Sequence, residues 1–254
     1  MEFIKKPNLP KGQASTVIIS KTAAELFEQK LRKLNIEALI VGSCPDLAGP
    51  VSDHPDMQLL HTGGRTFVLA ANSALLFDTQ KIGMNAVYAE KLKHDYPDDI
   101  MLNAAILDDK MFCLKKHISK KLFEFPFKVI SVKQGYSKCS ICVVDENSII
   151  TEDLSIHEAA MRNGIASLLI TKGYVSIDGY DYGFIGGATG KLSENLLAFT
   201  GKIDSHPDKD KILNFIDARN IKPLFLTDKD IFDVGSIIPV KESLREVLTP
   251  EQNL

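Results

Sequence analysis

Hydrophobic and polar positions along this chain follow a pattern that predicts one repeated structural unit. In the middle of the chain, an apolar run at 139–144, a polar turn at 145–147 and a second apolar run at 148–151 predict a β-hairpin. A segment with apolar residues at helical spacing follows at 155–164, and another short apolar run lies at 167–171. The unit is therefore strand, strand, helix, strand.

Four further copies of this unit are predicted elsewhere in the chain. The units start at a polar or aromatic residue, and these residues are 42, 40, 44 and 52 positions apart: His54, Tyr96, Tyr136, Tyr180 and Phe232. The first strands after these starts are expected at 57–60, 100–107, 139–144, 183–192 and 232–240. Such regular spacing is typical of a repeat architecture.

The expected helices of the remaining units lie at 22–34, 73–82, 118–125 and 207–219. The last unit has one strand near the C-terminus, so its second strand, its helix and its third strand must come from the N-terminal residues 15–41.

Five units that close on themselves through both chain ends predict a five-bladed α/β propeller, formed as a single domain over residues 1–254. An open, doubly wound α/β sheet is the alternative, but it does not require hairpins at regular spacing. Residues 1–12 are expected to be a polar tail, and 241–254 a second tail that forms a short surface helix.

Composition narrows the classes of function. The chain has 254 residues, of which 44% are hydrophobic, so it can bury a full core. A net charge of −3 argues against a general nucleic-acid binder. The sequence has neither an apolar run of about 20 residues nor the apolar segment of a signal peptide, so no membrane association and a cytoplasmic location are expected. The four cysteines are too sparse for a disulfide scaffold and are expected to be reduced.

Several motifs together resemble a known group of proteins. They span about 6–240 and are His54-Pro-Asp-Met-Gln-Leu59, Gln134-Gly-Tyr-Ser-Lys-Cys-Ser-Ile-Cys142 with Asp145-Glu-Asn147, Asp181-Tyr-Gly-Phe-Ile-Gly-Gly187, and Asp233-Val-Gly-Ser-Ile-Ile-Pro239. With these motifs the chain resembles an uncharacterised bacterial family that has the fold of guanidino-group-modifying enzymes, the propeller of arginine deiminases and amidinotransferases.

The resemblance implies a site in a central channel, where the strands begin. Enzymes of that fold use a cysteine nucleophile in the last unit, a histidine acid/base and carboxylates that hold the guanidinium. This sequence departs from the pattern, because its last unit reads Asp233-Val-Gly-Ser-Ile-Ile and no cysteine follows Cys142. A serine hydroxyl is a much weaker nucleophile than a thiolate unless a base activates it.

Cys139 is the candidate that could replace the missing nucleophile. It lies at the start of its unit, and the adjacent Lys138 could lower the pKa of its thiol. Its alternative role is a small apolar side chain packed at the channel. Cys139 and Cys142 form a C-x-x-C, but two residues three apart on a strand face opposite sides, so neither zinc nor a thioredoxin-type site is expected.

His54 and Asp56 are expected to act as a general base and its orienting carboxylate at another unit start; alternatively, Pro55 fixes a turn that Asp56 caps. The same tripeptide recurs at 206–208, where His206 is expected at the surface, beside a helix that Ser205 caps.

Polar residues near the other unit starts are expected to bind a cationic or zwitterionic substrate if they converge; alternatively, they cap turns. They are Asp98, Asp99, Asn103, Lys138, Asp181, Tyr182, Asp233 and Ser236. The glycine-rich run 183–191 ends in Gly-Lys but lacks the helix that a phosphate loop needs, so no nucleotide, cofactor or metal is expected.

Two hypotheses of different classes follow. In the first, the protein is an enzyme that acts on a small amine, amino acid or guanidino compound, as a hydrolase or transferase at a C–N bond. In the second, it is a binding or regulatory protein on the same fold that lacks catalysis. Both involve a small-molecule ligand in the channel, and self-association into a homo-oligomer is left open.

Overall fold

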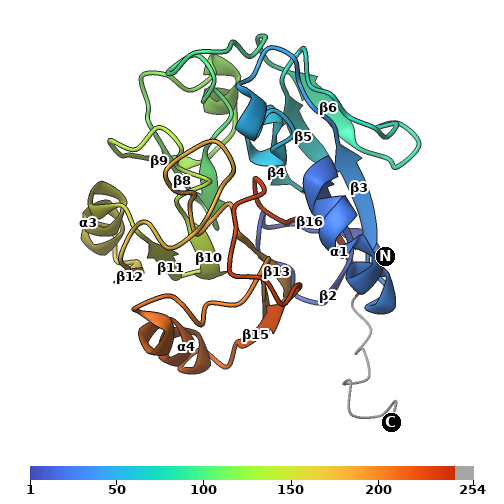
Figure 1. Ribbon diagram of the computed structural model, residues 1–254. Helices are drawn as coiled ribbons and strands as arrows, with labels where there is room; N and C mark the ends of the chain where they lie inside the picture. The colour runs from blue at the N-terminus through green and yellow to red at the C-terminus, as the bar shows by residue number, and fades with distance from the viewer. Residues whose placement is uncertain (244–254) are drawn as a thin grey trace.

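The computed structural model describes residues 1–243 (Figure 1) and shows a mixed α/β fold with five small sheets. In four sheets, the first two strands are antiparallel and the third runs parallel to the second. These strands are β4 (Leu59–Gly63), β5 (Thr66–Leu69) and β6 (Asn85–Tyr88); β7 (Ala105–Leu107), β8 (Lys110–Cys113) and β9 (Lys128–Ser131); β10 (Cys142–Asp145), β11 (Ser148–Thr151) and β12 (Ala166–Leu169); β13 (Thr189–Ser193), β14 (Leu196–Phe199) and β15 (Lys222–Phe225).

The fifth sheet joins the two ends of the chain. Strand β16 (Ile238–Ser243) pairs antiparallel with β2 (Gln13–Ser20), which pairs parallel with β3 (Glu37–Val41). The N-terminal segment is not a free tail, because β1 (Glu2–Phe3) adds to the outer side of β16. The first residues of the expected C-terminal tail, 241–243, belong to β16. The rest of the tail, 244–254, where the short helix is predicted, lies outside the described residues.

Three of the expected helices are present between the last two strands of a sheet: α1 (Lys21–Lys33), α3 (Leu154–Arg162) and α4 (Lys209–Asp217). Figure 1 shows α3 and α4 at the rim of the molecule. Each helix buries an apolar face against its own sheet and the neighbouring sheet. Phe27 and Leu31 of α1, for example, share a hydrophobic cluster with Leu192 of β13.

Two predicted helices are wrong or shortened. The segment 73–82 forms no helix, because its first residues pair with the end of β3 instead: Leu75 bridges Val41, and the N–H of Leu76 donates to the carbonyl of Ile40. The segment 118–125 forms only the 3₁₀ helix η2 (Lys120–Glu124), since the residue before Pro126 is excluded from helical geometry.

The first strands of the units begin later than predicted, and this difference positions the site. The residues before β4 form the short helix α2 (Pro55–Gln58), preceded by the 3₁₀ helix η1 (Gly49–Val51). The residues before β7, β10 and β13 form turns. Side chains expected on strands therefore lie on loops and a helix end, where they are free to point in directions that strand alternation would forbid.

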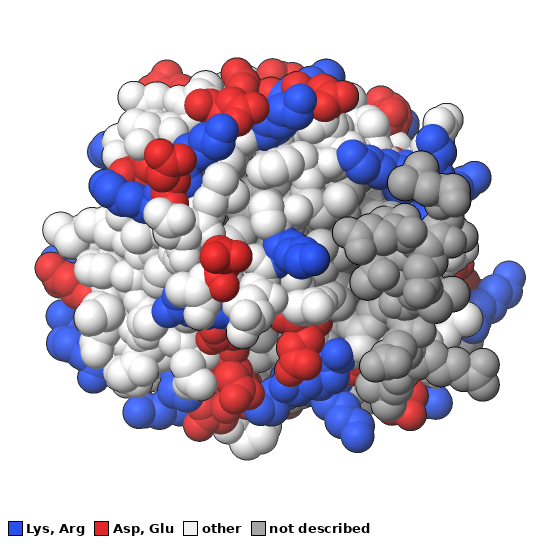
Figure 2. Space-filling view, turned by 90° about the horizontal axis from the view of Figure 1, so that it is seen from below, with Lys and Arg blue, Asp and Glu red and all other residues white. Residues whose placement is uncertain are grey.

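None of the helices within residues 1–243 is long and apolar enough to cross a membrane. On the face shown in Figure 2, acidic and basic side chains are interspersed, and no broad area of one sign is visible outside the grey atoms.

Candidate functional site

Cys139 lies in a buried polar network that joins three of the repeated units. Its thiol Sγ lies 3.3 Å from Oδ2 of Asp56, to which it donates, and accepts a hydrogen bond at 3.0 Å from Nδ2 of Asn103. The amide oxygen of Asn103 accepts from the backbone N–H of Lys138 at 2.8 Å. All these side chains are less than a tenth exposed. Asn103 therefore fixes the turn that carries the thiol.

A buried ammonium and a buried carboxylate are connected through a serine. Lys138 Nζ donates to Oγ of Ser236 at 2.8 Å, and this hydroxyl lies 2.7 Å from Oδ2 of Asp56. The carbonyl of Gly186 is a second acceptor for the same hydroxyl, at 2.9 Å. Because both charged groups are buried, their mutual attraction through Ser236 offsets part of the cost of removing them from water.

His54 lies beside a second buried carboxylate. Its Nδ1 is 3.8 Å from Oδ1 of Asp233, too far for a direct hydrogen bond, and has no hydrogen-bond partner among the described residues. Asp233 is held by the backbone N–H groups of Phe184 and Gly235, each at 2.9 Å. Gly235 has φ of 74°, and a Cβ there would overlap with His54, so this position requires glycine.

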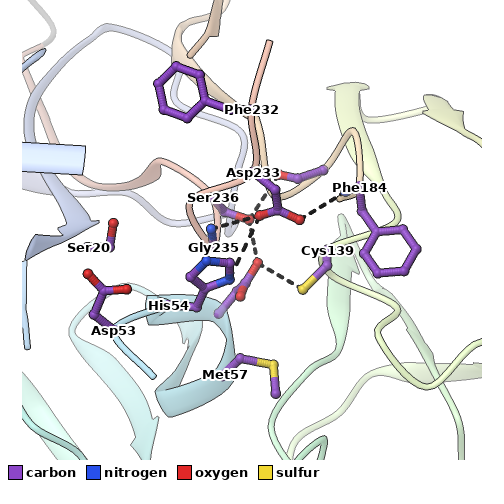
Figure 3. A network of polar contacts seen from close by, with 12 residues as sticks. Ser20, Asp53, His54, Met57, Cys139, Phe184, Phe232, Asp233, Gly235 and Ser236 are labelled. Carbon is purple, nitrogen blue, oxygen red and sulfur yellow. Dashed lines mark hydrogen bonds and ion pairs between the residues drawn. The ribbon is translucent and has the colours of Figure 1, made fainter. Parts of the chain in front are cut away.

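Figure 3 shows His54, Cys139 and the pair Asp233 and Ser236, which share one loop, converging on one region from segments far apart in the chain. Three of them, His54, Cys139 and Asp233, line a cavity of about 250 Å³, which we call the inner cavity. Its other lining residues are mainly aromatic or aliphatic: Val51, Met57, Tyr136, Ile177, Tyr180, Asp181, Tyr182, Gly183 and Phe184.

The aromatic side chains of the inner cavity form a continuous wall. The rings of Tyr136 and Phe184 lie 6.1 Å apart, and Tyr182 contacts Phe184 edge-on at 6.0 Å. Tyr136 is held from behind by Asp99, whose Oδ2 accepts from the phenol at 2.7 Å. Asp99 is thus a support of the wall and does not line the cavity itself.

Burial controls the titration of the site. It raises the pKa of the Cys139 thiol well above the usual value, and the nearby Asp56 carboxylate raises it further, so the thiol is protonated in the unliganded protein. Burial also raises the pKa of Asp233, partly countered by His54. The ammonium of Lys138, which was expected to lower the pKa of the thiol, donates to Ser236 and not to the thiol itself.

The predicted substrate-binding residues divide into three groups. Asp181, Tyr182 and Asp233 line the inner cavity; Asn103, Lys138, Ser236 and Asp99 lie behind its surface and position other groups. Asp98 is elsewhere: it is exposed and forms an ion pair at 2.7 Å with Lys93.

The expected positions of several other motif residues need correction. Cys139 lies in a turn and only Cys142 is on a strand, so the reason given for divergent thiols does not apply. No group of three His, Cys, Asp or Glu within residues 1–243 could hold a metal ion. Lys191 donates to the backbone carbonyls of Val144 and Glu194 from a buried position on β13, which is unlike the lysine of a phosphate loop.

Sequence reasoning missed that Tyr136, Tyr180 and Phe184 line the inner cavity, and it missed a buried carboxylate at Glu152. Tyr136 and Tyr180 stood only as markers of unit starts, although an aromatic residue recurring at such positions signals a shared wall. Glu152 follows β11 directly; one of its oxygens accepts from the N–H of Ile185 at 3.4 Å, and burial raises its pKa well above the usual value.

Comparison with known proteins decides the family. Residues 18–238 match a family of unknown function, DUF6873. The chain belongs to this family. No curated protein matches the sequence.

Solved structures show what the family's fold resembles. The inosamine-phosphate amidinotransferase of Streptomyces griseus is 10% identical, with a TM-score of 0.55, over 95% of this chain and 97% of that one. SxtG, an amidinotransferase from Microseira wollei in the saxitoxin biosynthetic pathway, is 9% identical, with a TM-score of 0.53, over 96% of this chain and 99% of that one. The expected similarity to the guanidino-modifying fold is confirmed, and at these identities it concerns the fold alone.

Proposed function

We propose that this DUF6873 protein acts on the amidino or guanidino group of a small cation, as a hydrolase or transferase at a C–N bond. In this proposal the five sheets form a five-bladed α/β propeller, and the inner cavity lies at the channel where the units meet. A cytoplasmic location and a homo-oligomer stay predictions.

One observation carries the proposal: a thiol and an imidazole face the same cavity, and each has a carboxylate beside it. Cys139 and His54 both line the inner cavity, although they come from units that are 85 residues apart in the chain. Asp56 accepts a hydrogen bond from the thiol, and Asp233 lies next to the imidazole. A nucleophile and an acid/base, each oriented by another group, is the arrangement that covalent catalysis requires.

The cavity wall suits a flat cation. Aromatic faces attract guanidinium and ammonium groups, most strongly where water is excluded. The carboxylates of Asp181 and Asp233 line the same cavity, while no lysine or arginine of the described chain does. A bound cation would also counter the effect of burial on Cys139, because a positive charge beside the thiol favours the thiolate.

The chemistry would proceed in two steps. Cys139 Sγ attacks the central carbon of the amidino group and gives its proton to Asp56, while the π electrons of the C=N bond move to nitrogen. The adduct collapses when His54 protonates the leaving amine, whose bond to carbon breaks, and an amidino-cysteine remains. Water or a second amine then attacks this carbon and gives its proton to His54, the C–S bond breaks, and the released thiolate takes its proton back from Asp56. Asn103, which donates to Sγ, would stabilise that thiolate.

The competing function is a binding protein without catalysis. The observation that favours it is the state of the thiol, which burial keeps protonated and which donates to Asp56. In this case the cavity binds a cation and Cys139 only completes its wall.

Reaction with 2-chloroacetamidine, an electrophilic mimic of a guanidinium, separates the two. We expect rapid labelling of Cys139, still present at pH 6 and prevented by excess agmatine, measured by intact mass and peptide mapping between pH 5 and 9. The matched control is Cys113, which is also buried and whose pKa burial raises to about 12. Cys139→Ser should abolish labelling and Cys113→Ser should not. Labelling shared between cysteines, or absent, would overturn the catalytic proposal and favour the binding protein.

A further inference from the structure

A second cavity opens on the other side of His54. Its volume is about 560 Å³, and we call it the outer chamber. His54, Ile177 and Asp233 line both spaces, so these three residues form the boundary between them. Figure 3 shows Asp53, which lines the outer chamber, and Cys139, which lines the inner cavity, on opposite sides of His54.

The outer chamber is strongly acidic. Four carboxylates line it, from Asp53, Asp178, Asp230 and Asp233, against the single ammonium of Lys229. Asp178 and Asp230 are exposed and form no ion pair with any of the described residues, whereas the nearby Asp228 is paired with Lys202 at 2.8 Å. Asp53, by contrast, accepts hydrogen bonds from the N–H and the hydroxyl of Thr22. The charges of Asp178 and Asp230 are therefore the ones that no ion pair of the described residues compensates.

Independent evidence for a ligand comes from His54, which lies at the boundary between the two cavities. His54 is only 3% exposed, yet its Nδ1 has no hydrogen-bond partner in residues 1–243. A buried ring nitrogen without a partner costs free energy, and such a group is retained where a bound molecule supplies the missing contact. Because His54 lines both spaces, that molecule would pass by it.

We infer that the outer chamber is a subsite for a second positive charge, so that the preferred ligand is a linear dication. One end, the guanidinium or amidinium, lies against the aromatic wall of the inner cavity and makes the polar contact that Nδ1 of His54 lacks, and an alkyl chain continues past Ile177. The other end, an ammonium, lies among Asp53, Asp178 and Asp230. This inference rests on the proposed function for the first end of the ligand. It also excludes amino acids with a free α-carboxylate as preferred ligands, because that group would lie among like charges.

The test measures binding by titration calorimetry in the Cys139→Ser variant, so that no reaction occurs. The probes differ by one group each: agmatine has a guanidinium and an ammonium, butylguanidine lacks the ammonium, arginine adds a carboxylate, and putrescine replaces the guanidinium with an amine. We expect agmatine to bind at least about fivefold more tightly than butylguanidine, the factor that one favourable charge pair supplies. Arginine should bind more weakly than agmatine.

Charge removal in the outer chamber should abolish that preference. The variants are Asp178→Asn and Asp230→Asn, and the matched control is Asp228→Asn, which removes an exposed charge that does not line the chamber. We expect agmatine and butylguanidine to become nearly equal in the first two and to keep their difference in the third. Added salt should reduce the difference in the parent protein, since the chamber is open to solvent.

The outcomes separate this inference from the proposed function. Equal binding of agmatine and butylguanidine, or an equal effect of all three substitutions, would overturn the second-charge subsite and leave the guanidino site intact. Putrescine that binds as tightly as agmatine, with both weakened by Asp178→Asn, would support the subsite but contradict recognition of the guanidino group. Binding of none of the four probes would overturn both.

Discussion

The tripeptide His-Pro-Asp occurs twice in this protein, at 54–56 and at 206–208, and the side chains of its two copies make different kinds of contact. In the first, His54 lines the inner cavity and Asp56 contacts Cys139 and Ser236. In the second, Asp208 accepts from both the N–H and the hydroxyl of Thr171, and its own N–H donates to Nδ1 of His206. All hydrogen bonds of the second copy tie together a loop and the start of α4.

The difference lies in what surrounds each copy. The first copy precedes the short helix α2 and meets residues from distant units, up to 180 positions away in the chain. The second copy is buried as well, contrary to the expected surface position of His206, but its partners are local or come from the adjacent loop. The same three residues build a site in one place and a loop anchor in the other, so the motif alone does not identify the function.

The largest contrast should come from removing the carboxylate of each copy. Asp56→Asn leaves the buried Lys138 ammonium without its negative partner, which costs about 3 kcal/mol of unfolding free energy. Asp208→Asn keeps an acceptor for Thr171 and loses an ion pair with the exposed side chain of Lys211, so its cost should be below about 1 kcal/mol. Urea denaturation at pH 7 measures both.

The rate of Cys139 labelling gives a second comparison of the variants Asp56→Asn and Asp208→Asn. Asp56→Asn should slow the reaction of Cys139 with chloroacetamidine, because the loss of the base that accepts the thiol proton outweighs the lower thiol pKa that follows from removing this charge. Asp208→Asn should leave the reaction rate unchanged. Equal losses of stability and equal labelling rates in the two variants would show that the copies are not functionally distinct.

A glycine that supports only the first copy gives an intermediate effect. Gly235→Ala introduces a Cβ that overlaps with His54 and also strains a backbone with φ of 74°. Gly164→Ala, the control, has φ of 73° and no atom within 4 Å of its added Cβ.

The strain alone costs about 1 kcal/mol, so Gly164→Ala should lose that amount and Gly235→Ala about 1 kcal/mol more. Only Gly235→Ala should weaken ligand binding, as calorimetry with agmatine would show. A Gly235→Ala protein that matches the control in stability and binds normally would contradict the assigned position of His54.

The smallest expected effect is on the pH dependence of the unfolding free energy, and it comes from His206 in the second copy. Burial lowers the pKa of His206, so the unfolded chain takes up a proton more readily than the folded protein as the pH falls through about 6.5. The neutral His206 therefore makes its full contribution to stability above about pH 6.5. The contribution is lost as the pH falls towards the lower pKa that His206 has in the folded protein.

His206→Asn should therefore reduce the loss of unfolding free energy between pH 7 and pH 5, as measured by urea denaturation at each pH. Part of the loss should remain, because the pKa of the buried His61 is also lowered, to about 4. An unchanged pH dependence in the variant would mean that His206 is not the titrating group of the second copy.

The sequence alone predicted the unit that the structure repeats. Hairpins at 142–151 and 189–199, the parallel strands that follow them, and the sheet shared by both chain ends are present close to where the apolar pattern indicated. Periodicity and turn residues report such local structure well, because each strand or helix has to bury one face regardless of its neighbours. The pattern failed for the helix at 73–82, where Leu75 and Leu76 pair with the end of β3, a contact between residues far apart in the chain.

The sequence also determined which polar residues stand near the unit starts, but only the tertiary structure decided which of them meet. Asp98 and Asp99 are adjacent in the chain, yet one is paired with Lys93 at the surface and the other supports Tyr136. Cys139 and Ser236, from two different units, are joined through Asp56 of a third unit. A site of this kind depends on distances between residues far apart in the chain, and those distances are set by the packing of the sheets, about which the local pattern carries no information.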